Sequence, residues 1–187
     1  MHAPRDGSQV WPAAFAVGVL SLVLGAITLG DKALWFDEAF NARHVEDSWR
    51  NLALVIRSTE MSQGAYMAGL KLWTTVAPDS ETWLRLPSVA FAALAAALLV
   101  PLGTRLFDGP TGIIAGVLLA TNAFLVRHAQ EARTYALVTL AVVVASLLFV
   151  RALDDPRRQA AITMPATKIA MNLRTTWWSI KIGRAHV

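Results

Sequence analysis

Residues 10–29 read VWPAAFAVGVLSLVLGAITL, an apolar run of 20 residues without a charged side chain. An α-helix rises about 1.5 Å per residue, so this run spans about 30 Å, the thickness of a bilayer's hydrocarbon core. A signal peptide would have an apolar core of about 7–15 residues after a basic start. Here the run is longer, and Arg5 is followed directly by Asp6. The run therefore predicts a retained membrane-spanning helix.

Three further apolar runs predict spans at about 83–102, 111–126 and 135–150. The whole chain is 55% hydrophobic, and its charged share of 16% lies below the roughly 25% of soluble domains. We therefore expect an all-α polytopic membrane protein with about four transmembrane helices. We place Pro87 in the first turn of the second span, where proline is tolerated, with Ser80 or Asp79 as N-cap.

The segment 61–77, MSQGAYMAGLKLWTTVA, is too short for a comfortable crossing and carries Gln63 and Lys71. We expect it to lie in the membrane interface as an amphipathic helix, with Tyr66 and Trp73 as anchors. The spacing of apolar residues over 31–61 predicts one or two surface helices as well. If 61–77 does not cross, the loops 31–82 and 127–134 share one face. Arginines gather on the other face, so the positive-inside rule places the acid-rich first loop outside.

The charge of the chain is uneven. Residues 1–155 carry 11 basic and 13 acidic side chains, whereas residues 156–187 carry 6 basic side chains and no acidic one. The net charge of +4 therefore comes from the tail, and we infer no nucleic-acid binding from it. The last six residues, IGRAHV, are the translation of ATC GGA AGA GCA CAC GTC, which resembles a sequencing-library adapter. We expect these six residues to derive from adapter DNA, and the chain to be a fragment of a longer protein.

Two short motifs carry the chemistry: LWFDEAF (34–40) follows the first span, and QEARTYAL (130–137) opens the fourth. With GAYMAGLKLW and WLRLPSVAF between them, their order over about 10–153 resembles the N-terminal part of the glycosyltransferase C superfamily. The closest likeness is to its protein O-mannosyltransferase and aminoarabinose-transferase branch. The resemblance implies about a dozen membrane helices, and an acidic motif with interfacial helices in the first external loop. It also implies a polyprenyl-phosphate sugar as donor and a protein or glycolipid as acceptor, and we expect a bacterial plasma membrane with the active face outside.

Carried over by position, the resemblance implies that Asp37 is catalytic, with Glu38 beside it. Transfer from a lipid-linked sugar releases a phosphate, so the main need is a base for the acceptor hydroxyl. Partial desolvation by Trp35, Phe36 and Phe40 would make Asp37 a better base. The alternative is that Asp37 caps the following helix. Glu38 would bond the acceptor, hold or tune Asp37, or serve as a favourable acid in a helix's first turn.

Four further residues are candidates for substrate binding: Arg133, Tyr135, Arg85 and Tyr66. Arg133 and Tyr135 match the superfamily's Arg-x-Tyr. A guanidinium at the membrane face can bind a lipid phosphate through two hydrogen bonds. The alternative is that Arg133 only extends its charged group to the interface, as arginines near span ends do. For Arg85 an interfacial anchor is favoured over a phosphate or carboxylate partner. Where many relatives have prolines before the aromatic positions of the interfacial helix, this chain has Ser62-Gln63-Gly64, with Tyr66 close behind.

No cofactor is expected. A divalent metal lacks support, because His128 with nearby carboxylates does not have a ligand-set spacing. Arg127 and Glu131 are four residues apart, which predicts a helical salt bridge. We therefore expect a truncated glycosyltransferase, inactive alone, in which Asp37 is the general base and Arg133 holds lipid phosphate. The alternative is a non-enzymatic transporter or scaffold fragment whose acids and arginines pair structurally. The two differ in topology, since the enzyme needs Asp37 and Arg133 on one side of the membrane.

Overall fold

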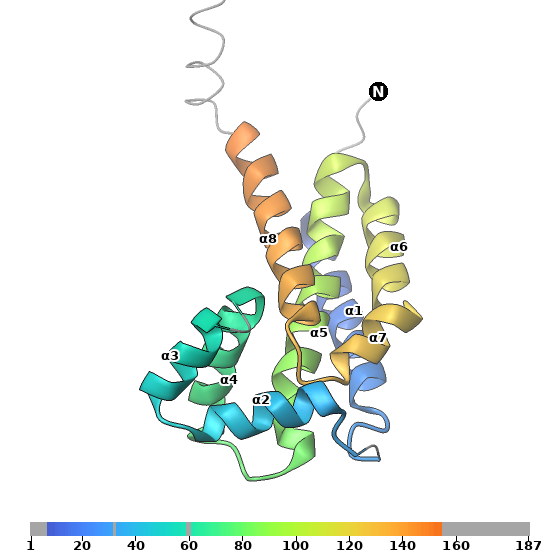
Figure 1. Ribbon diagram of the computed structural model, residues 1–187. Helices are drawn as coiled ribbons and strands as arrows, with labels where there is room; N and C mark the ends of the chain where they lie inside the picture. Colours follow the sequence, from blue (N-terminus) through green and yellow to red (C-terminus); the bar gives the residue numbers. More distant parts are fainter. Residues whose placement is uncertain (1–6, 32, 59–60, 155–187) are drawn as a thin grey trace, which may run out of the picture. The chain divides into compact units, whose positions relative to one another are not determined.

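The computed structural model describes residues 7–31, 33–58 and 61–154, and in these ranges the regular structure is helical throughout (Figure 1). The elements in chain order are α1 (Gly7–Ala26), α2 (Phe36–Glu46), α3 (Trp49–Ser58), the 3-10 helix η1 (Met61–Gln63), α4 (Gly64–Thr74), α5 (Glu81–Leu106), α6 (Gly109–Ala120), α7 (Ala123–Ala129) and α8 (Tyr135–Leu153). The expected all-α class is confirmed. The chain divides into two units, Met1–Leu147 and Leu148–Val187, and the structure describes only 148–154 of the second. The basic tail and its last six residues lie outside the described residues.

Three described helices are long and apolar enough to cross a membrane: α1, α5 and α8. The predicted spans place these three helices correctly but miss their ends. α1 ends at Ala26 rather than 29, and the turn that follows holds Thr28 at a φ of 63°. α5 begins at Glu81, where the Ser80 hydroxyl accepts the Trp83 amide at 3.3 Å as the expected N-cap. Pro87 therefore lies in the second turn of α5, and its placement in the first turn was wrong.

The third predicted span is not one straight helix. α6 and α7 are bent by 55° across a short break, and only as a pair do they pass for a fourth crossing. Asn122 causes the break, because its Oδ1 accepts the Leu125 amide at 3.0 Å and so starts a new helix. The span expected over about 111–126 therefore corresponds to this bent pair, and its break was not predicted. α6 alone, with 12 residues, is about 18 Å long.

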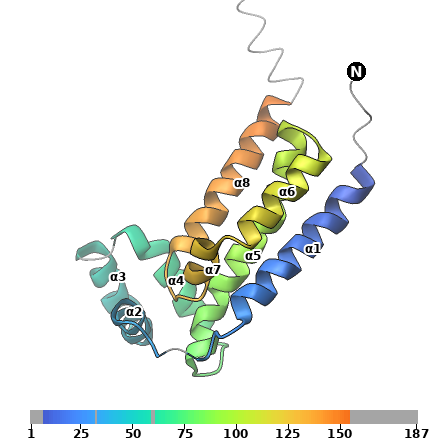
Figure 2. The same cartoon turned by 90° about the vertical axis from the view of Figure 1, so that its right-hand side faces the viewer.

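α1, α5 and α6 pack side by side with very close backbones (Figure 2). Small residues allow this, since Ala14, Ala96 and Ala120 form a buried cluster with Val17 and Val100. The Cα of Gly112 on α6 lies 2.7 Å from where a Cβ on Gly103 of α5 would stand. Outward-facing apolar residues such as Phe15 on α1 (74% exposed) are then left for lipid.

Gly112→Ala is expected to destabilise this packing by about 1–3 kcal/mol. A Cβ at this position would stand 2.6 Å from the backbone nitrogen of Thr104, and would also meet the carbonyl of Val100. Neither atom can move without shifting α5. Gly109→Ala on the same helix is the matched control, because a Cβ there has nothing within 4 Å. Thermal unfolding in detergent measures the effect, and equal midpoints for the two variants would contradict the close contact.

The helices α2, α3 and α4 lie at one end of the spanning helices, next to the end of α1 and the start of α5 (Figures 1 and 2). Of the one or two surface helices expected over 31–61, the structure shows two, α2 and α3, which bury Val45 and Leu52. Lys71 of α4 donates to the carbonyl of Val45 at 2.7 Å, tying α4 to the end of α2. α4 has only 11 residues and is not among the helices that can cross.

Tyr66 is not an interfacial anchor, contrary to expectation. It is 2% exposed and belongs to a buried cluster with Val45, Leu70, Leu84 and Ala132. This cluster joins α2, α4 and α5 to the segment before α8. The cluster adjoins the polar groups described next, because it includes Ala132, whose backbone they bind.

Candidate functional site

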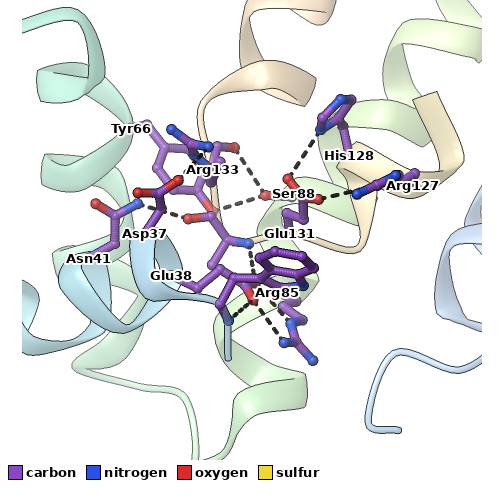
Figure 3. Close-up of polar contacts among 12 residues, drawn as sticks. Asp37, Glu38, Asn41, Tyr66, Arg85, Ser88, Arg127, His128, Glu131 and Arg133 are labelled. Atoms are coloured by element: carbon purple, nitrogen blue, oxygen red, sulfur yellow. Dashed lines mark hydrogen bonds and ion pairs between the residues drawn. The ribbon is translucent and has the colours of Figure 1, made fainter. Parts of the chain in front are cut away.

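The polar side chains predicted to carry function come from three parts of the chain that meet at this end (Figure 3). Asp37 and Glu38 lie in the first turn of α2, and Arg85 lies near the start of α5. Arg133 belongs to the non-helical segment between α7 and α8. Because all three parts meet here, the loops after the first span and before the fourth share one side of the molecule, as the sequence predicted.

Glu38 and Arg85 form a buried ion pair with two parallel hydrogen bonds. Arg85 Nε donates to Glu38 Oε1 and Nη2 donates to Oε2, both at 2.9 Å. The side chains are only 1% and 2% exposed. Two backbone amides complete the carboxylate's partners, Ala132 N at 2.7 Å to Oε1 and Trp35 N at 3.1 Å to Oε2. Each carboxylate oxygen therefore accepts two hydrogen bonds, and neither is presented to solvent.

The ionised state of Glu38 follows from these contacts. Burial on its own raises the pKa of this carboxyl group, because a charge is costly in an apolar environment. The hydrogen bonds from Arg85, Ala132 and Trp35 outweigh burial, so the pKa of Glu38 lies below its ordinary value. Glu38 is therefore a charged structural group at neutral pH.

Arg85 also donates hydrogen bonds to the segment that follows α1. Its Nη1 donates to the carbonyl of Leu29 at 2.8 Å, and its Nη2 to that of Ala33 at 3.2 Å. The favoured expectation of an interfacial anchor is wrong, because the guanidinium is buried. The alternative of a carboxylate partner is the one the structure shows, with Glu38 as that partner. Substrate binding by Arg85 stays a prediction, and the contacts described here point inward.

Asp37 and Arg133 form a second ion pair that is open to solvent. Arg133 Nη1 lies 2.8 Å from Asp37 Oδ2, and the side chains are 25% and 53% exposed. Asp37 does not cap α2, because Trp35 is the N-cap residue and Asp37 lies inside the first turn. Of the three residues expected to form an aromatic wall around it, Trp35 and Phe36 are 63% and 84% exposed, whereas Phe40 is partly buried. What sets Asp37 apart from Glu38 is therefore its exposure to solvent.

Two aromatic candidates flank Arg133 in different ways. The Tyr135 ring centroid lies 5.0 Å from the Arg133 guanidinium carbon, a cation–π contact, and Tyr135 is 39% exposed. The Tyr66 hydroxyl instead shares a buried hydrogen bond of 2.9 Å with Ser88, and burial raises the pKa of Tyr66. Ser88 in turn donates to the Arg133 carbonyl at 3.4 Å. Tyr135 is therefore partly exposed beside Arg133, whereas Tyr66 is buried and reaches the Arg133 backbone through Ser88. Substrate binding by either tyrosine stays a prediction.

His128 pairs with Glu131, its Nδ1 lying 3.1 Å from Oε2. Arg127 approaches the other oxygen of Glu131 at 3.8 Å, so the expected ion pair is present, but Glu131 lies two residues beyond the end of α7. Within the part of the chain that the structure describes, no group of three or more His, Asp and Glu side chains could hold a metal ion. The side chains of Arg127, His128 and Glu131 form a local polar cluster, drawn on the right of Figure 3.

Sequence reasoning missed Asn41 and Ser88. Asn41 is fully buried, and its Nδ2 donates to the carbonyl of Ala132 at 2.9 Å. Its position four residues after Asp37, on the same face of a predicted helix, was a usable signal. Ser88 gave none, since a serine in an apolar helix is unremarkable.

Comparison with known proteins gives one match. Residues 65–180 match the sequence model of the dolichyl-phosphate-mannose-protein mannosyltransferase family. The matched range includes Arg85, Arg133 and Tyr135, whereas Asp37 and Glu38 precede it. Neither the curated proteins nor the solved structures contain a match. Because the match covers more than half of the chain, and its apolar helices fit a membrane setting, this chain belongs to the dolichyl-phosphate-mannose-protein mannosyltransferase family of integral membrane glycosyltransferases.

Proposed function

We propose that the chain carries the acidic site of a transferase that moves a sugar from a polyprenyl-phosphate donor to a hydroxyl acceptor on the outer face. The observation that carries this proposal is the ion pair between exposed Asp37 and Arg133 at 2.8 Å. It supplies a carboxylate able to take a proton beside a cation able to bind phosphate. We favour Asp37 over the neighbouring acid, Glu38, because Arg85 and two amides occupy the oxygens of Glu38.

The proposed reaction is a single displacement at the sugar's anomeric carbon. The acceptor oxygen forms the new bond to carbon while the bond to the phosphate oxygen breaks, and the lipid phosphate leaves with the bonding electrons. The acceptor proton passes to Asp37, acting as general base. One displacement inverts the anomeric centre. The acceptor, a protein or a glycolipid, supplies the hydroxyl.

Two groups compete for the Arg133 guanidinium in this mechanism: the Asp37 carboxylate and the lipid phosphate. In the structure its Nη1 is engaged by Asp37, while its Nε is buried without a hydrogen-bond partner among the described residues. A lipid phosphate offers several acceptor oxygens and a negative charge, so it competes with Asp37 for the guanidinium. Donor binding would then release the Asp37 carboxylate at the moment when it must accept a proton.

Asp37→Asn is therefore expected to tighten phosphate binding while it removes the base. Losing a partly exposed ion pair of about 0.5–1 kcal/mol frees Arg133, which corresponds to a gain of about two- to fivefold in affinity. Titration of the purified chain in nanodiscs with a short isoprenyl phosphate measures this directly. Arg133→Ala should weaken the same binding.

Glu46→Gln is the matched control, because it removes one acid from the same helix and leaves Arg133 untouched. Glu46 pairs only loosely with Arg43, at 4.0 Å, and is 68% exposed. Equal affinities for Asp37→Asn and Glu46→Gln would show that Asp37 and phosphate do not share Arg133. Unchanged affinity in Arg133→Ala would remove Arg133 from donor binding.

A further inference from the structure

The segment that carries Arg133 is held by its neighbour, Ala132. Ala132 lies in the non-helical stretch between α7 and α8 and is fully buried. Glu38 Oε1 accepts its N–H at 2.7 Å, and Asn41 Nδ2 donates to its carbonyl at 2.9 Å. Two side chains from one turn of α2 thus satisfy both backbone polar groups of this residue, which buried backbone requires.

We propose that Asn41 is a positioning residue that, together with Glu38, holds Arg133 opposite Asp37. The pairing is in register: Glu38 binds Ala132, and the preceding Asp37 binds the following Arg133. Fixing the Ala132 peptide on α2 therefore fixes where the Arg133 side chain begins. The role of Asn41 in sugar transfer rests on the proposed function, whereas the hydrogen bonds that hold Ala132 on α2 belong to the fold.

The amide of Asn41 has one orientation that fits this position. Its Nδ2 donates to Ala132 O and, at 3.4 Å, to Gln63 Oε1. Turning the amide over would bring Asn41 Oδ1 against the Ala132 carbonyl, which can only accept a hydrogen bond. Aspartate at position 41 would do the same, and leucine has a similar size but no donor. Asn41 is thus needed as a donor and not only as a filler of space.

Glu38 alone cannot fix the Ala132 peptide. Of the two polar groups of this peptide residue, Glu38 binds the N–H, and without Asn41 the carbonyl would lose its side-chain donor. The 3.4 Å bond from Ser88 to the Arg133 carbonyl lies one residue further on and is longer. Removing Asn41 should therefore let the 132–133 segment turn about its amide, carrying Arg133 away from Asp37.

A distance measurement tests the hold. The chain has no cysteine, so Phe36→Cys and Thr134→Cys place two nitroxide labels on either side of the Glu38–Ala132 contact. Pulsed electron spin resonance in nanodiscs should give one narrow distance in the parent chain. Asn41→Leu should broaden it or add a second distance. Leu52→Ala is the control, because Leu52 on α3 is also buried but lies outside the cluster that contains Ala132.

The role in transfer has its own readout. In the full-length protein, Asn41→Leu should lower kcat by about a hundredfold, the scale of a misplaced reacting group, while the KM for the donor changes little. Leu52→Ala should leave kcat near the parent value at a temperature where both variants are folded. An unchanged distance distribution in Asn41→Leu would overturn the hold. A broadened distribution with parent kcat would overturn the positioning role. Full transfer by Asp37→Asn would instead overturn the proposed base, and the distance result would still decide the hold.

Discussion

Glu38→Gln is expected to destabilise the fold by about 3–5 kcal/mol, the usual cost of leaving one partner of a buried ion pair uncompensated. Glutamine cannot neutralise Arg85, which is buried with it. In either orientation its NH₂ group would face an Arg85 donor and one backbone amide, that of Ala132 or that of Trp35. Four segments lose a shared anchor: the turn after α1, α2, α5 and the segment before α8. Equilibrium unfolding of the detergent-solubilised chain measures this loss.

The exposed acid Glu46 provides the comparison, since Glu46→Gln should change stability by less than about 0.5 kcal/mol. Arg85→Met should resemble Glu38→Gln, because it strands the carboxylate in the same site. If Glu38→Gln and Glu46→Gln unfold at the same denaturant concentration, the Glu38–Arg85 pair does not hold these segments together.

The same pair predicts how stability depends on pH. Because the folded state lowers the pKa of Glu38 from 4.5, its contribution is fully present above that ordinary value. The contribution is lost as pH falls through the lowered folded-state pKa. Unfolding curves between pH 7 and pH 3 should therefore show an acid loss of stability that is smaller in Glu38→Gln. An equal acid loss in both proteins would contradict the lowered pKa.

Asp37→Asn is expected to reduce kcat for sugar transfer by about 10²–10⁴-fold in the full-length protein. Asparagine keeps the size of the side chain but cannot take the acceptor proton. Folding should survive, because Asp37 is 53% exposed and makes one ion pair with Arg133. Transfer of a radiolabelled sugar from a polyprenyl phosphate to the acceptor fraction gives kcat, and unfolding gives stability.

The contrast with Glu38 makes this result specific. Loss of transfer in Asp37→Asn with parent stability identifies a chemical role, whereas loss of transfer in Glu38→Gln should come with loss of stability. Asp47→Asn, on the turn after α2, controls for removal of one acid from the loop. Transfer by Asp37→Asn at the parent rate would exclude Asp37 as the base.

The sequence predicted the architecture well where a single physical signal dominates. Long uncharged runs identify α1, α5 and α8, because only a helix satisfies its backbone in lipid. The break between α6 and α7 was missed, although Asn122 has the residue type of an N-cap. Inside an apolar run the hydrophobic signal masked that local hydrogen bond.

The site was predicted in part. The motifs LWFDEAF and QEARTYAL could be placed on one side, because the number of membrane crossings between them decides whether they share a face. The partners could not be predicted, since Glu38 meets Arg85 across 47 residues and Asn41 meets Ala132 across 91. Such pairings depend on how α2 turns against α5, and periodicity within one helix does not specify that rotation. Tyr66 and Arg85 accordingly looked like interface residues, whereas the structure buries both.

The central claim is that Asp37 and Arg133 face each other on one side of the membrane. Because the chain lacks cysteine, Asp37→Cys and Arg133→Cys can each be probed with a membrane-impermeant thiol reagent in sealed vesicles. Phe107→Cys, 72% exposed at the far end of α5, reports the opposite side. The structure predicts that positions 37 and 133 are labelled from the same side and position 107 from the other. Labelling of positions 37 and 133 from opposite sides would contradict the shared site and, with it, the proposed enzyme.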